Sequence, residues 1–193
     1  MTINSKELKE NLSKKLQKAC EKHLEKILEE IQEKKIFAYT IFCSSGTHMG
    51  IAIATEEGAC KTLDSSQWDY VNNYYEVFYE TNEYIDTLYE IFYDEELKDI
   101  DLDELDDDEL WEFISGFLVD VVVEVVSRLK TSGMFNKNYF DKDLLLGINF
   151  GDPDINQIPM IEKSSKKLNS QQWHEKVSLY CKRLNNGSQI STE

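Results

Sequence analysis

Residues Asp94 to Lys130 read DEELKDIDLDELDDDELWEFISGFLVDVVVEVVSRLK, and this stretch decides the fold. In its second half the apolar side chains recur at every third or fourth position, which gathers them in one stripe along an α-helix. The stripe consists of Leu110, Phe113, Ile114, Phe117, Leu118, Val121, Val122, Val125 and Leu129. We therefore predict a helix over about 107–130 that lies in the core.

The first half of the stretch is an acidic run, in which 11 of the 16 residues from Asp94 to Glu109 are acidic. Carboxylates at the start of a helix face its partial positive charge, and each contributes a few tenths to about 1 kcal/mol. Asp106 or Asp107 is expected to be the N-cap. Eleven acids exceed what capping requires, so the run is either a solvated loop or a docking face for a cationic partner. The docking residues would be Glu95, Glu96, Asp99, Asp101, Asp103, Glu104, Asp106, Asp107 and Asp108.

The net charge of the 193 residues is −16, and it is concentrated in the middle of the chain. Residues 1–35 carry 9 basic and 7 acidic groups (+2), residues 36–135 carry 4 and 23 (−19), and residues 136–193 carry 8 and 7 (+1). A surface of this sign repels phosphate backbones and anionic lipids. We therefore expect no nucleic-acid or membrane partner, and a basic protein as the natural partner.

Outside the acidic run, the chain predicts a single α+β domain over 1–185, with a small, mainly antiparallel sheet packed against long helices. A Lys/Glu-rich amphipathic helix is expected over about 5–35, and IFAYTIFC and MGIAIAT form a β-hairpin over 36–55 whose first strand is central. LLLGINF over 144–150 is predicted as another central strand. Residues 67–80 fit neither period cleanly; they favour an extended segment near Trp68 and then a helix from about Tyr75 to Glu96. A short helix near 161–168, a last helix over about 171–185 and a flexible tail over 186–193 complete the prediction.

The expected cellular setting follows from the N-terminus, the lengths of the apolar runs and the cysteines. The polar N-terminus leads into the Lys/Glu helix, so no signal peptide is expected, and no apolar run approaches the roughly 20 residues of a membrane span. The four cysteines show no CxxC or metal-type spacing and are predicted to be reduced. We therefore expect a cytoplasmic protein without a cofactor or a metal. The sequence gives no oligomeric state.

Two patterns resemble catalytic or metal sites. Asp99, Asp101 and Asp103 have the spacing of a calcium loop, but positions six and twelve of that loop hold Glu104 and Leu110, where glycine and glutamate are required. Cys43 and His48 lie on opposite sides of the predicted hairpin turn, but no third group is identifiable that would orient the histidine. We predict no catalytic residue.

Three segments carry a family resemblance: IFAYTIFCSSGTHMGIAIAT (36–55), SSQWDY (65–70) and LLLGINFGDPDINQIPMIEKSSKKLNSQQW (144–173). In this order they resemble a widespread bacterial family of small acidic proteins, a domain of unknown function. The segments consist of core strands and turns, so the resemblance carries over no catalytic residue. Relatives of this type resemble immunity proteins, which bind and block a toxin.

The resemblance and the charge together imply a non-catalytic, immunity-type inhibitor whose acidic surface docks a basic protein such as a toxin. Two alternatives stay open. The first is an enzyme or small-ligand protein with a site between sheet and helices, which a concave pocket with convergent polar groups would favour. The second is a structural or regulatory subunit, which an exposed apolar patch would favour.

Overall fold

The computed structural model describes residues 4–31, 34–43, 48–55, 62–94, 102 and 105–190. Within them, α-helices and strands alternate irregularly along the chain, as an α+β fold requires. The elements are α1 (Ser5–Ile31), β1 (Ile36–Cys43), β2 (Met49–Thr55), η1 (Ser65–Gln67), β3 (Tyr70–Val71), η2 (Tyr75–Phe78), α2 (Tyr79–Asp94), α3 (Asp107–Thr131), β4 (Phe140–Phe150), α4 (Ile158–Leu168) and α5 (Gln171–Ile190).

The strands form a mixed sheet in the order β3-β2-β1-β4. The predicted hairpin is confirmed, because β1 pairs antiparallel with β2 from Ile36↔Thr55 to Cys43↔Met49. β1 also pairs with β4, but in parallel, so the prediction of a mainly antiparallel sheet is not confirmed. β1 is a central strand, as its apolar sequence predicts.

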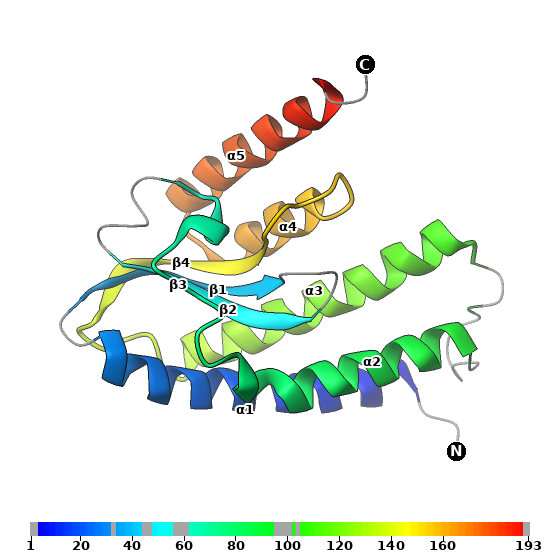
Figure 1. Ribbon diagram of the computed structural model, residues 1–193, viewed down its shortest axis with the longest axis horizontal. Coiled ribbons are helices and arrows are strands. Elements are labelled where there is room, and N and C mark those ends of the chain that lie inside the picture. Colours follow the sequence, from blue (N-terminus) through cyan, green and yellow to red (C-terminus); the bar gives the residue numbers. More distant parts are fainter. Residues whose placement is uncertain are drawn as a thin grey trace.

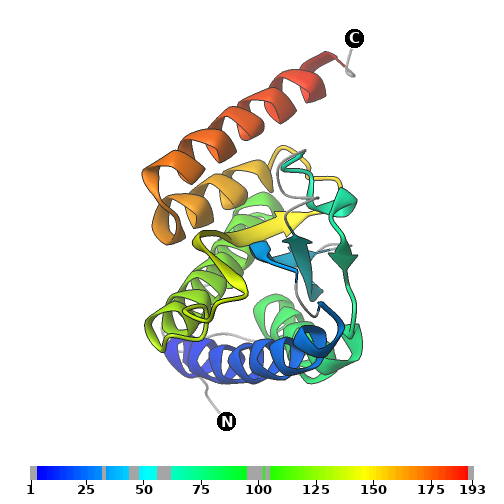
Figure 2. The ribbon, with the colours of Figure 1, turned by 90° about the vertical axis from the view of Figure 1, so that its left-hand side faces the viewer.

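Helices lie on both faces of the sheet (Figures 1 and 2). α1 and α3 pack on one face, where the Tyr39 hydroxyl of β1 lies 3.5 Å from the Cys20 carbonyl oxygen of α1. α2 runs beside α1. α4 packs on the other face, and α5 lies outside α4. The sequence predicts the coverage by α1 and α3; the second layer of α4 and α5 was not expected.

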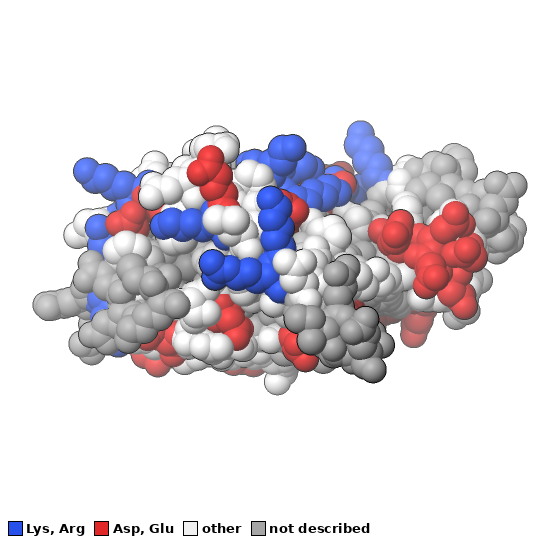
Figure 3. Space-filling view, turned by 90° about the horizontal axis from the view of Figure 1, so that it is seen from above, with Lys and Arg blue, Asp and Glu red and all other residues white. Residues whose placement is uncertain are grey.

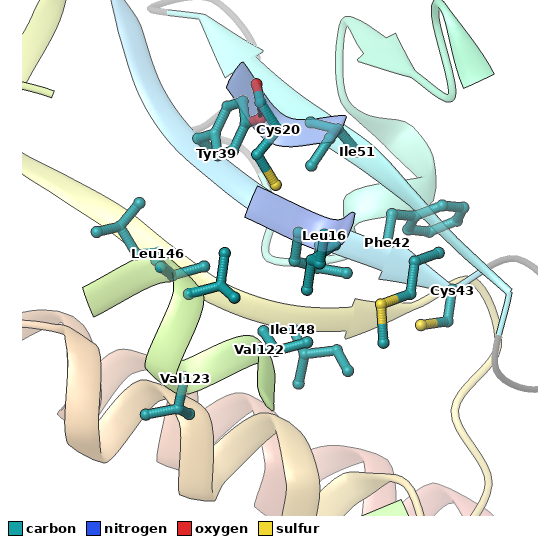
Figure 4. Packing of buried hydrophobic residues seen from close by; sticks show 14 of the residues in the cluster. Leu16, Cys20, Tyr39, Phe42, Cys43, Ile51, Val122, Val123, Leu146 and Ile148 are labelled. Atoms are coloured by element: carbon teal, nitrogen blue, oxygen red, sulfur yellow. Dashed lines mark hydrogen bonds between the residues drawn. The ribbon is translucent and has the colours of Figure 1, made fainter. Parts of the chain in front are cut away.

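The hydrophobic core fills the space between α1, α3 and the sheet (Figure 4). Leu16 and Cys20 of α1 lie beside β1 and β2, and Val122 of α3 lies beside Ile148 of β4. All four side chains are buried. Seven of the nine stripe residues of α3 are buried, so the prediction of a core helix is confirmed, whereas Phe113 and Phe117 are half-buried. α3 ends at Thr131, and Gly133 adopts a left-handed φ of 80° after the Ser132 C-cap.

β4 is an edge strand, which corrects the prediction of a central strand over 144–150. Its outer edge is covered by side chains instead of a further strand. Asn169 accepts from the Leu146 amide (2.8 Å) and donates to the Leu146 carbonyl (2.7 Å). Ser164 accepts from the Ile148 amide, and the Trp173 indole donates to the Asp143 carbonyl at 2.6 Å. Because both faces and the edge are covered, an edge strand here has the apolar sequence of a central one.

Several boundaries differ from the prediction. α1 is described to Ile31, and β4 begins at Phe140, four residues before the predicted start. The ambiguous 67–80 segment contains the two-residue strand β3 and the 3-10 turn η2, so the α-helix begins at Tyr79 instead of about Tyr75. α4 begins at Ile158, three residues early, because Pro159 suits the first turn of a helix. α5 continues to Ile190, past the predicted end at 185.

His23 of α1 is a buried histidine on the core side of the helix, 1% exposed. Its Nε2 lies 3.1 Å from the Asn73 carbonyl oxygen, which only accepts, so Nε2 carries the proton. The rings of Tyr39, Tyr74 and Phe78 surround it. Burial lowers the pKa of His23 to about 4, so the imidazole is neutral at pH 7.

Candidate protein-docking surface

The acidic run enters α3 through a capping box. Asp106 Oδ1 accepts from the Glu109 amide at 2.9 Å, and the Asp106 amide donates to Glu109 Oε2 at 3.2 Å. These two bonds satisfy backbone groups that a helix start leaves unpaired. The prediction of Asp106 as an N-cap is confirmed, and two of the acids in this turn have a structural role.

Three neighbouring carboxylates do not take part in the capping box. Asp107, Asp108 and Glu112 are exposed, and none forms an ion pair with a residue in the described part of the chain. Six other carboxylates in the described structure have a lysine partner. Such pairs are Glu10–Lys14, Glu76–Lys26, Glu80–Lys18, Asp141–Lys35, Asp120–Lys163 and Glu124–Lys9.

The C-terminal half of α2 lies against the start of α3 at one end of the molecule (Figure 1). Phe92 fixes this arrangement, because its ring meets Phe113 and Phe117 edge-on at centroid distances of 5.4 and 5.5 Å. On the surface, Tyr89 stacks between Trp111 (6.4 Å) and Tyr93 (6.3 Å). Tyr93 is 52% exposed, so an aromatic step lies beside the unpaired acids. Aromatic side chains of this kind are frequent anchors in protein interfaces.

α2 adds negative charge to the same end. The sequence from Tyr79 to Asp94 contains no lysine or arginine. Glu83 and Glu90 are exposed, and neither forms an ion pair within the described residues. Asp86 is held by His48, whose Nε2 lies 2.8 Å from Asp86 Oδ1. We call the group Glu90, Asp106, Asp107, Asp108, Glu109 and Glu112 the acidic surface.

The acidic surface contains only part of the predicted docking set. Asp106, Asp107 and Asp108 belong to it. The remaining predicted residues, Glu95, Glu96, Asp99, Asp101, Asp103 and Glu104, lie outside the described residues. The prediction omitted Glu109, Glu112, Trp111 and the acids of α2. The lack of any basic residue over 79–94 was the sequence signal that pointed to α2.

Charge is not distributed uniformly over the face seen in Figure 3, because basic side chains gather on one part of it and acidic side chains on another. In Figure 3, Lys and Arg gather over α4 and α5, and a cluster of Asp and Glu lies over the first turn of α3. The exposed cations of α4 and α5 are Lys163, Lys166, Lys167, Lys176, Lys182 and Arg183. Because unlike ends set up a field along the molecule, a basic partner would be oriented toward the α3 end.

The geometry gives little support to chemistry at Cys43. Burial raises the pKa of the Cys43 thiol to about 12, so it is protonated and weakly nucleophilic at neutral pH. His48 is hydrogen-bonded to Asp86 across the hairpin end. Two pockets between the sheet and the helices, one beside Cys43 and one beside Thr40, each hold about 20 Å³, room for about one water. Among the described residues no group of three His, Cys, Asp or Glu side chains is placed to hold a metal.

Two further findings bear on the setting of this surface. No helix in the described ranges is both long and apolar enough to cross a membrane. No protein-family model, no curated protein and no solved structure matches the chain.

Proposed function

We propose that this protein is a non-catalytic, cytoplasmic binding protein whose acidic surface docks a basic protein, as an immunity-type inhibitor docks a toxin. One observation carries the docking proposal: Asp107, Asp108 and Glu112 are exposed without an ion pair in the described structure, whereas carboxylates further along the same helix are paired. The immunity-type role rests on the sequence resemblance alone.

The acidic surface suits a basic partner in two ways. Unpaired carboxylates leave their field in solution, which accelerates the encounter with a cationic surface. The neighbouring step of Tyr89, Tyr93 and Trp111 offers apolar area, which holds the complex once it has formed. A toxin that attacks nucleic acid has a basic active site, and a dense acidic surface competes with phosphate for such a site.

The first experiment captures the partner and then measures its association. The tagged protein is incubated with nuclease-treated host lysate at low and at high salt, and a dominant basic protein is identified and purified. Its association rate is then measured against the triple variant Asp107→Asn, Asp108→Asn and Glu112→Gln. We expect association about tenfold slower, with a flatter salt dependence, because steering depends on local charge.

A matched triple variant controls for net charge. Glu25→Gln, Glu29→Gln and Glu175→Gln also remove three negative charges, from exposed positions on α1 and α5. We expect these changes to slow association by less than about twofold, since the charges lie away from the acidic surface. Equal effects of the two triples, or no effect of either, would contradict docking at the acidic surface.

A further inference from the structure

A groove lies on the outer side of α3, next to the acidic surface, where α1, α3 and α4 meet. Its volume is about 520 Å³. Phe113, Gly116 and Phe117 of α3 form an apolar floor, and Lys6 and Lys9 of α1 and Lys163 of α4 line the sides. The groove is therefore bounded by three helices and open to solvent above the middle of α3.

Gly116 leaves the centre of the floor empty. A Cβ placed on Gly116 would meet no atom within 4 Å. Glycine in a helix interior destabilises the helix relative to alanine. Packing does not require glycine here, because no neighbouring atom occupies the space that a side chain would fill. A glycine at such a place allows another backbone to approach α3 closely.

The walls of the groove are braced before anything binds. Lys9 Nζ lies 3.5 Å from Glu124 Oε2, which joins α1 to α3. Lys163 Nζ lies 3.2 Å from Asp120 Oδ1, which joins α4 to α3. A groove held open in the free protein spares its ligand the cost of ordering the walls.

Charge is ordered along the groove. Glu112 lies at the end nearer the acidic surface. Lys9 and Lys163 lie two to three turns further along α3, where they pair with Glu124 and Asp120. Lys6 lines the same groove without an ion pair in the described structure, so the lysines outnumber the acids among the residues that line it. Eight helical residues separate Glu112 from Asp120, which is about 12 Å at 1.5 Å per residue. An α-helix carries partial positive charge at its N-terminus and partial negative charge at its C-terminus, so this order matches a helix lying parallel to α3.

We propose that this groove docks an amphipathic α-helix of a protein partner, with the N-terminus of that helix toward Glu112, its C-terminus toward the lysines, and a small residue over Gly116. Phe113 and Phe117 contact its apolar stripe, as in other helix-in-groove interfaces. Glu112 belongs both to the acidic surface and to the groove, so the test below substitutes Gly116, which lies only in the groove.

The test uses two stapled helical peptides of about 15 residues, roughly four turns. Both have the same Leu/Ala stripe with one central glycine; one has lysines in the first turn and glutamates in the last, and the other has these charges exchanged. The staple keeps their helicity equal, since the exchange would otherwise change it. Each is titrated into the ¹⁵N-labelled full-length protein, and amide shifts are followed by NMR.

We expect the first peptide to shift the amides of Gly116, Phe117 and Lys6 and to bind at least about fivefold more tightly than the exchanged peptide, a difference of about 1 kcal/mol. Gly116→Leu should weaken binding about tenfold. The same variant should not lower the melting temperature, because the new side chain enters open space. Gly116→Ala should raise it by about 2 to 4 °C, since alanine favours the helix.

Ser127→Leu is the matched control, because residue 127 lies on the same side of α3 as Gly116, three turns further on and outside the groove. It should leave peptide affinity unchanged. The proposal is overturned if Gly116→Leu binds as the wild type does, if the exchanged peptide binds equally well, or if the shifts lie on α2 and not on the groove. Saturable binding of monomeric dodecanoate at Gly116, without binding of either peptide, would overturn it in favour of a small amphiphile.

Discussion

The first turn of α3 and the middle of the same helix use carboxylates in opposite ways. In the middle, Asp120 meets Lys163 and Lys167 of α4, and Glu124 meets Lys9 of α1, so these acids join helices. In the first turn, Asp107 and Asp108 are exposed and meet no lysine or arginine in the described structure. Acidic residues of one helix therefore divide into those that join helices and those that are exposed without a lysine or arginine partner in the described structure. The following substitutions test that division, from the largest expected effect to the smallest.

The apolar side of α3 should dominate stability. Leu129 is 1% exposed, and Leu129→Ala leaves a cavity among packed side chains. We expect it to lower the free energy of unfolding by about 2 to 5 kcal/mol, measured by urea denaturation. The double variant Asp107→Asn and Asp108→Asn should change it by less than about 1 kcal/mol, because lost helix-dipole attraction is offset by relieved repulsion. A loss above that from the acidic pair would assign these residues to the fold.

His23 is a third case, a buried titratable side chain that is uncharged in the folded protein at neutral pH. Its pKa is about 4 in the folded protein, against an ordinary value of 6.5, so the folded state favours the neutral ring. The stabilisation is complete above about pH 6.5 and is lost as the pH falls toward 4; the total is about 3 kcal/mol, at 1.36 kcal/mol per pKa unit.

The measurement is the difference in unfolding free energy between wild type and His23→Gln over pH 4 to 7. Glutamine keeps a donor for the Asn73 carbonyl but does not titrate, so the difference isolates His23 from the carboxylates that titrate nearby. The wild type should lose its advantage as the pH falls. A pH-independent difference for His23→Gln would contradict the buried neutral ring.

Asp106 should behave unlike its neighbours. It caps α3 through the Glu109 amide, so Asp106→Ala is expected to cost about 1 kcal/mol of unfolding free energy. Asp106→Ser preserves the cap and should restore most of the loss. If Asp107→Ala lowers the free energy of unfolding as much as Asp106→Ala does, the distinction between a capping acid and the other acids of this turn is wrong.

The paired carboxylates should give the smallest effect. Burial alone would raise the pKa of Asp120, but Lys163 and Lys167 outweigh it and hold that pKa below its ordinary value of 3.8. The side chain is 41% exposed, so screening reduces the gain, and Asp120→Asn should cost about 0.5 kcal/mol. This contribution is present above pH 3.8 and is lost as the pH falls through the lowered pKa. Thermal unfolding at pH 7 and pH 3 checks both statements.

The helices and the hairpin were predictable because their signals are local. The stripe from Leu110 to Leu129 and the β-branched run from Ile36 to Cys43 each specify their own element. The pairing of β1 with β4 was not predictable, since about 100 residues separate them and parallel pairing leaves no turn signal. The cover over the edge of β4 comes from Ser164, Asn169 and Trp173, whose hydrogen bonds to β4 span at least 16 positions and leave no periodic signal.

The sequence predicts that the candidate site is acidic, but it does not predict which residues form its surface. The acidic run is visible in the sequence, and so is the capping pattern at Asp106. The sequence does not show which carboxylates find lysines, because Asp120 meets residues of α4 more than 40 positions away. The stacking of Tyr89 on Trp111 could not be predicted for the same reason, since it depends on how the end of α2 meets α3.

The side-chain cover over β4 has a consequence for how this protein behaves when concentrated. An uncovered edge strand is a template on which another chain can add a strand, and this is a common start of fibril growth. Here both backbone groups of Leu146 are already taken by Asn169, and the Ile148 amide by Ser164. Strand addition at this edge must first remove those side chains, so the cover acts as a barrier against ordered self-assembly of an otherwise β-prone sequence.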